Sequence, residues 1–146
     1  MNYQEYEERC ESIKEKNNEY INLFQSELIQ QGLSVKTINK HIDNVDFYLN
    51  DFLIWSEPRT MAEGCFEIRE FLGYFFIRKC MWSTPASIRS NASSLKKFYK
   101  CMLSYGHIEE EQYEGLCETI KDNLDGWIAD CKQYNDISQP SPFDYF

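Results

Sequence analysis

The sequence has few of the residues that interrupt helices or build metal sites. Its 146 residues include six glycines, four prolines and two histidines. Because glycine and proline punctuate secondary structure, their scarcity predicts long regular elements with few breaks. A chain of this length can form one domain with a packed core. We expect residues 1–134 to form that domain and residues 135–146 to form a mobile, loop-like tail.

No hydrophobic run approaches the length that crosses a bilayer. The longest, from Phe71 to Ile77, has seven residues, whereas a transmembrane helix needs roughly 20. The amino-terminal stretch MNYQEYEERCESIKEK is polar and acidic, unlike the basic and then apolar start of a secretory signal. We therefore expect no membrane contact and a cytoplasmic location.

The sequence contains no C-x-x-C pair that would suggest zinc. Only His41 and His107 are available to complete a metal site, so we expect no metal and no cofactor. Most cysteines fall on or beside apolar positions of predicted helices, which predicts buried thiols in a reducing compartment. The cysteines are Cys10, Cys65, Cys80, Cys101, Cys117 and Cys131.

Five segments show the three- and four-residue spacing of apolar side chains that is typical of helices, and none shows strand-like alternation. The sequence therefore predicts an all-α fold, a compact bundle of about five helices. The first helix ends at Gly32, and the second begins with Ser34 as its N-cap and ends before Pro58. The third covers about residues 65–82 and has apolar side chains in most directions, so we expect it to be central.

The fourth segment has the clearest boundaries. Thr84 is a good N-cap, Pro85 suits the first helical position, and Gly106 supplies the stop. The fifth helix covers about residues 109–134 and begins with three glutamates, which suit the positive end of the helix dipole.

The net charge of −9 is distributed unevenly. Residues 1–33, 34–105 and 106–146 carry net charges of −4, +3 and −8, and residues 71–108 contain six basic side chains and no acidic one. On the fourth helix, polar and basic side chains follow helical spacing beside the apolar stripe, at Arg89, Ser93, Lys96 and Lys100. Such a surface suits nucleic-acid phosphates. Alternatively, these cations pair with carboxylates of the first and fifth helices.

Two stretches carry a family resemblance. The first is GLSVKTI at residues 32–38, followed by Ile42, Val45, Leu49 and Phe52; the second is SIRSNASSLKKFYK at residues 87–100, followed by GHI at residues 106–108. Together they resemble the core-binding domain of tyrosine recombinases and phage integrases, an all-helical, SAM-like module that precedes the catalytic domain. The resemblance covers about residues 15–110.

The resemblance implies that the two motif helices grip a DNA duplex. In the family, the starts and polar faces of these helices meet the phosphates and the major groove. Carried over position by position, the implied DNA-binding residues are Ser34, Lys36, Thr37, Lys40, His41, Asn44, Thr84, Ser87, Arg89, Ser90, Ser93, Lys96, Lys97 and Lys100. Arg89 is the candidate for a base-edge contact. On residue type alone, His41 on a polar helix face is expected to be solvated.

The catalytic residues of that family are missing. Recombinase chemistry needs donors fixed around the reacting phosphate, but the sequence contains no H-x-x-R. We therefore expect a non-catalytic DNA-binding domain connected with DNA integration or site-specific recombination. Its expected partners are double-stranded DNA and a recombinase or another protein. The alternative is a protein-interaction module without DNA binding, which would use exposed aromatic residues at Tyr3, Tyr6, Phe143, Tyr145 and Phe146.

Overall fold

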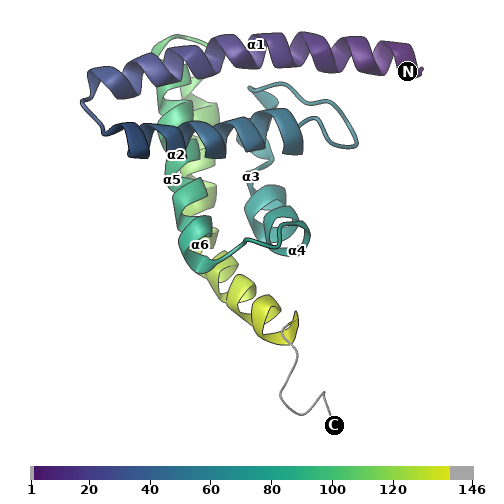
Figure 1. Cartoon of the computed structure of the whole chain (residues 1–146), viewed down its shortest axis with the longest axis vertical. Coiled ribbons are helices and arrows are strands. Elements are labelled where there is room, and N and C mark those ends of the chain that lie inside the picture. Colours follow the sequence, from purple (N-terminus) through teal and green to yellow (C-terminus); the bar gives the residue numbers. More distant parts are fainter. Residues whose placement is uncertain (1, 139–146) are drawn as a thin grey trace.

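The computed structural model describes residues 2–138, and every regular element within them is helical (Figure 1). The long helices are α1 (Tyr3–Gln30), α2 (Val35–Asp46), α5 (Pro85–Ser104) and α6 (Glu110–Ser138). Between α2 and α5 lie the π-helical turn η1 (Phe47–Phe52), the 3-10 turn η2 (Glu63–Phe66), α3 (Ile68–Glu70), the π-helical turn η3 (Phe71–Phe75) and α4 (Phe76–Lys79). This confirms the predicted all-α bundle. None of the described helices is both long and apolar enough to span a membrane.

Local signals set the helix ends that the sequence predicted. The Ser34 hydroxyl oxygen accepts a hydrogen bond from the Thr37 amide at 3.2 Å, and the Thr84 hydroxyl oxygen accepts one from the Ser87 amide at 3.0 Å. Gly32 and Gly106, with φ of 75° and 78°, follow α1 and α5 in the left-handed conformation that glycine adopts without strain.

The core forms where two pairs of helices cross. In Figure 1, α1 and α2 run side by side across the pair formed by α5 and α6. Phe24 of α1 meets Phe98 of α5 edge to face, with ring centroids 5.4 Å apart. Tyr99 is fully buried, and its hydroxyl donates to the Met61 carbonyl oxygen at 2.7 Å, which ties the loop after η1 to α5. Burial of apolar and aromatic surface supplies most of the driving force for this arrangement.

The segment between residues 65 and 82 is less central than the sequence predicted. Phe71 and Phe76 are buried, but Tyr74 and Trp82 have exposed fractions of 49% and 61%. The segment lies at the side of the bundle against η1 and α6, so one face is covered and the other is open. The prediction of a central helix is therefore wrong for its outer face.

Helix α6 extends four residues past its predicted end, to Ser138. Near this end, Cys131 is fully buried in the core. The Asn135 side-chain amide also donates to the Ser83 carbonyl oxygen at 3.1 Å, which helps to hold the last turns of α6. The remaining predicted tail, with the aromatic residues Phe143, Tyr145 and Phe146, lies outside the described residues.

The cysteines are free thiols, as the sequence predicted. Four are buried: Cys65, Cys80, Cys101 and Cys131. Burial raises the pKa of the Cys65 thiol to about 12 and the pKa of the Cys80 thiol to about 11. These side chains therefore serve as small apolar groups in the core.

Candidate nucleic-acid interface

The structure brings the two resembling stretches together, because α2 packs directly against α5. The Asn44 side-chain amide on α2 donates to the hydroxyl oxygens of Ser90 and Ser94 on α5, both at 3.0 Å. His41 Nδ1 lies 2.7 Å from the Ser94 hydroxyl oxygen. These contacts join the polar sides of the two helices, so the candidate residues of both stretches belong to one region of the molecule.

His41 lies in that contact rather than on the surface. Its exposed fraction is 7%, and its ring packs 6.5 Å from the ring of Phe24. The sequence places this histidine on a polar, solvated helix face, and the structure corrects that expectation. The physical reason is that Ser94 on α5 gives the imidazole a buried hydrogen-bond partner, which removes the cost of taking it out of water.

Asn44 and Ser90, two further candidate residues, are half-buried and bonded to each other. Their polar groups therefore act between the helices. Ser94 takes part in the same contacts and is fully buried, and sequence reasoning did not select it. Its position on the boundary between the apolar stripe and the polar face of the fourth helix was the available signal.

His41 lies near cations of both helices. Burial lowers the pKa of His41, and the positive charges of Lys97 on α5 and Lys40 on α2 lower it further. Cations from two different helices therefore act on one imidazole ring, which stays neutral near pH 7.

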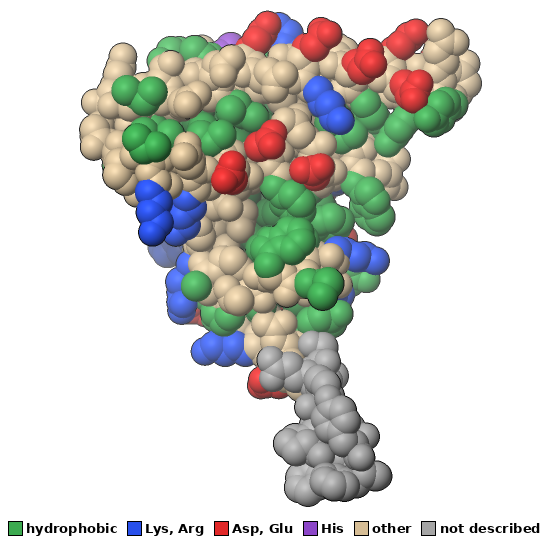
Figure 2. All heavy atoms as spheres, viewed as in Figure 1, with side chains coloured by type: hydrophobic (Ala, Val, Ile, Leu, Met, Phe, Trp, Pro, Cys, Tyr) green, Lys and Arg blue, Asp and Glu red, His purple; other side chains and the backbone are tan. Residues whose placement is uncertain are grey.

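Six exposed cations form what we call the cationic edge: Lys36, Lys40, Arg89, Lys96, Lys97 and Lys100. The ion pairs found within residues 2–138 are Lys16–Glu19 and Arg59–Glu67, and neither involves this edge. In Figure 2, Lys and Arg side chains follow the edge of the molecule beside α5, whereas Asp and Glu side chains gather over α1 and α2. Pairing with carboxylates of α1 and α6, the alternative that the sequence left open, is not observed in the described part of the chain.

A groove of ≈ 390 Å³ runs between α5 and α6 beside the cationic edge. Four polar or basic residues of α5 line it, Arg89, Ser93, Lys96 and Lys97, and Ile120 and Leu124 of α6 form its apolar wall. No carboxylate is among its lining residues. The acidic helix α6 therefore packs against α5 through apolar side chains, and it leaves the cations beside this groove open.

Two carboxylates border the cationic edge. Glu27 of α1 shares a small cavity of ≈ 190 Å³ with Lys97 and Lys100, and Asp43 of α2 lines the same hollow as Lys36 and Lys40. Neither carboxylate forms an ion pair in the described residues. Both carboxylates reduce the net positive charge next to these lysines.

The remaining candidate residues are the hydroxyls at the helix starts and Ser93. Ser34 and Thr84 are exposed and cap α2 and α5, and Thr37 and Ser87 complete the two capping contacts. Ser93 is exposed on α5. Both helix starts therefore present the partial positive charge of their first turn to solvent, close to the cationic edge.

Comparison of the chain with protein-family models, with curated proteins and with solved structures finds no match. The functional argument therefore depends on the geometry and charge of this surface.

Proposed function

We propose that this chain is a non-catalytic domain that binds double-stranded DNA, as its resemblance to integrase core-binding modules implies. One observation carries the proposal. Two helices that cross and pack against each other, α2 and α5, present six exposed Lys and Arg side chains, and none of the six has a carboxylate partner within residues 2–138.

The proposed mechanism is phosphate binding with counterion release. Lysines of α2 and α5 neutralise phosphates along one side of the duplex, and binding releases condensed counterions. Arg89 stands near the start of α5 with no hydrogen-bond partner in the described residues, and a guanidinium can donate two hydrogen bonds to a guanine edge. His41, Asn44 and Ser90 hold the two helices together and are not part of the proposed contact surface.

Binding by this surface should be weak and sensitive to salt. One side of a duplex offers the domain about three to five phosphate contacts, and affinity falls steeply with salt even for such a small number. The resemblance further implies a role in DNA integration or site-specific recombination, as an accessory or decoy domain that accompanies a recombinase.

Duplex binding measured by fluorescence anisotropy tests this proposal. We expect salt-sensitive binding that is abolished by the triple variant Arg89→Glu, Lys96→Glu, Lys100→Glu. The matched control reverses three exposed cations on α1 and α3, Arg9, Lys14 and Arg69, and so makes the same change in net charge. Absence of binding at low salt, or equal loss of binding in both triple variants, would overturn the proposal.

A protein-interaction module is the second candidate function. It is favoured by exposed aromatic side chains, although these differ from most of those that the sequence suggested. Tyr3 is exposed and Tyr6 is half-buried, whereas a contiguous aromatic surface lies elsewhere, around Trp55 and Trp82.

A further inference from the structure

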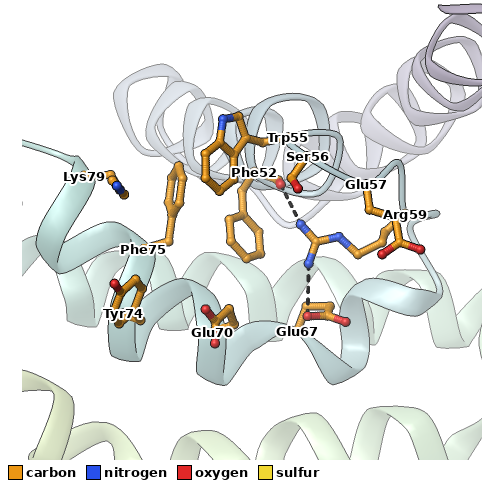
Figure 3. Close-up of a pocket in the computed structure, with 10 residues that line it drawn as sticks. All are labelled: Phe52, Trp55, Ser56, Glu57, Arg59, Glu67, Glu70, Tyr74, Phe75 and Lys79. Carbon is orange, nitrogen blue, oxygen red and sulfur yellow. Dashed lines mark hydrogen bonds and ion pairs between the residues drawn. The ribbon is translucent and has the colours of Figure 1, made fainter. Parts of the chain in front are cut away.

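A pocket of ≈ 450 Å³ opens between the loop that follows η1 and the helical segment α3–η3–α4 (Figure 3). Aromatic rings and carboxylates line it: Phe52, Trp55, Tyr74 and Phe75 supply the rings, and Glu57, Glu67 and Glu70 supply the carboxylates. Figure 3 shows Trp55 and Phe75 toward one end and Arg59 toward the other. In Figure 1, α3 and α4 lie to the right of α5. The proposed DNA surface does not involve this pocket.

Arg59 builds one end of the pocket. Its Nε donates to the Leu53 carbonyl oxygen at 3.2 Å, its Nη2 to the Phe52 carbonyl oxygen at 2.8 Å, and its Nη1 to Glu67 Oε2 at 3.0 Å. The guanidinium also lies 4.7 Å from the Phe52 ring centroid. These bonds fix the loop, which includes Ser56 at a φ of 70°. The Arg59 guanidinium therefore already bonds to oxygen atoms of the protein, and the carboxylate of Glu67 offsets its charge.

The charge that remains in the pocket favours a cation. The carboxylates of Glu57 and Glu70 line it without a hydrogen bond or ion pair in the described residues, and Lys79 is the only other basic residue in the lining. The lining side chains therefore carry three carboxylates against two cations. The Tyr6 hydroxyl of α1 donates to the Ile54 carbonyl oxygen at 3.3 Å, which holds the glutamate-rich start of α1 against the same loop.

The rings of this region are suited to cations as well. Trp55 has an exposed fraction of 57%, and its ring centroid lies 5.6 Å from that of Phe75. The neighbouring Tyr74 ring already holds the guanidinium of Arg78 at 4.6 Å. Aromatic faces, and indole most strongly, attract ammonium and guanidinium groups through their negative quadrupole.

The aromatic surface continues beyond the pocket. Phe47 lies 6.4 Å from Phe75 and 5.7 Å from Trp82, measured between ring centroids. Trp82 and Met81 have exposed fractions of 61% and 100%. Contiguous exposed apolar surface bordered by charged residues is typical of a protein-binding site.

We propose that the pocket binds a lysine or arginine side chain from a basic segment of a partner protein. The cation lies against Trp55 between Glu57 and Glu70, and apolar residues flanking it in the segment pack on Phe47 and Trp82. A cation is favoured over an anion because the half-buried Arg59 guanidinium is already bonded, and the two unpaired carboxylates outnumber Lys79, the one unpaired cation in the lining. This site does not depend on DNA binding.

The three tryptophans provide a direct test by NMR. The indole N–H resonances of Trp55, Trp82 and Trp127 can be followed in the ¹⁵N-labelled protein, with Trp55→Phe used to assign the first. The probes are acetyl-Leu-Arg-Leu-amide and acetyl-Leu-Lys-Leu-amide, with acetyl-Leu-Glu-Leu-amide as control. We expect both basic peptides to shift the Trp55 resonance in a saturable way and to leave the buried Trp127 unchanged. The acidic peptide should produce no saturable shift at the same concentrations.

Charge variants separate pocket binding from general attraction. The double variant Glu57→Gln, Glu70→Gln removes the two free carboxylates, and we expect it to weaken binding of the basic peptides about fivefold, as for two exposed charge pairs. Glu114→Gln, Glu118→Gln on the exposed face of α6 is the matched control and should bind like the unchanged protein. Equal affinity in both double variants, or no preference for the basic peptides, would overturn the proposal.

Discussion

His41 of α2 and Ser94 of α5 form the buried polar contact between the two helices of the cationic edge, with Nδ1 2.7 Å from Oγ. Asn44 donates to the same Ser94 oxygen. A neutral imidazole protonated on Nε2 allows the Ser94 hydroxyl to donate to Nδ1, so all three side chains have partners. The contact fixes how α2 sits on α5, and thereby how their cations are arranged.

Ser94→Ala should destabilise the fold. The change leaves His41 without its hydrogen-bond partner in a nearly closed site, and an unsatisfied buried polar group costs about 1–3 kcal/mol. The measurement is the free energy of unfolding from urea titration. Ser93→Ala removes an exposed hydroxyl one residue earlier and should change stability by less than about 0.5 kcal/mol. Equal effects of the two changes would contradict the contact.

The titration of His41 should report on the lysines around it. Its pKa is lowered in the folded protein, so between that pKa and the ordinary value near 6.5 the unfolded chain binds more protons. Stability therefore rises with pH across that interval, and it is lost as pH falls through the folded pKa. Lys97→Gln should raise the pKa of His41, as measured by NMR titration. A pKa unaffected by Lys97→Gln would contradict the effect of the Lys97 charge on His41.

DNA should shift the same titration. Phosphates bound at Lys40 and Lys97 would offset the charges that help to keep His41 neutral, so we expect saturating duplex to raise the pKa of His41. His107 lies outside the cationic edge and serves as the internal comparison. An unchanged His41 titration in the presence of bound duplex would place the DNA on another surface.

Helix boundaries could be predicted because their causes are local. The Ser34 and Thr84 side chains accept hydrogen bonds from amides three residues away. The glycines after α1 and α5 have a positive φ, which glycine adopts without strain. The burial of His41 depends on Ser94, 53 residues later in the sequence. No local pattern reports that pairing, so polar spacing alone placed His41 on the surface.

The aromatic pocket was missed for a similar reason. Periodicity identified the apolar residues between 65 and 82, but it could not show which of them the rest of the chain covers. Trp55 and Tyr74 are exposed, and Arg59 holds the loop after η1 by bonding to the Phe52 and Leu53 carbonyl oxygens. The loop is held by side chains distant from it in the sequence as well as by Arg59, since the Tyr6 and Tyr99 hydroxyls donate to its carbonyl oxygens at Ile54 and Met61.

Gly64→Ala should destabilise the protein, because the backbone at Gly64 lies against buried side chains. An added Cβ would lie 2.8 Å from Leu53 Cδ1 and in collision with the Tyr99 hydroxyl. Overpacking of this kind costs about 1–3 kcal/mol. Gly126→Ala is the control, since open space surrounds that position in α6, and it should stabilise by about 0.5–1 kcal/mol. Thermal unfolding of both variants distinguishes them by the sign of the change in Tm.

Thiol labelling should follow burial. Iodoacetamide at pH 8 should modify the half-buried Cys10 and Cys117 first, whereas Cys65 and Cys101 should react only on unfolding. Burial raises the pKa of Cys65 to about 12 and that of Cys101 to about 11, so their thiolate fraction is very small. Peptide mapping by mass spectrometry gives the order of modification. Early labelling of Cys65 in the folded protein would contradict the packing around it.

The most direct measurement of the central claim is the salt dependence of duplex affinity. Three to five phosphate contacts predict that the logarithm of the association constant falls with the logarithm of salt concentration with a slope of about −3 to −4.5. Lys40→Gln and Lys97→Gln should each reduce the steepness by about 1. A slope near zero, a slope unaffected by both changes, or no binding at about 50 mM salt would contradict DNA binding by the cationic edge.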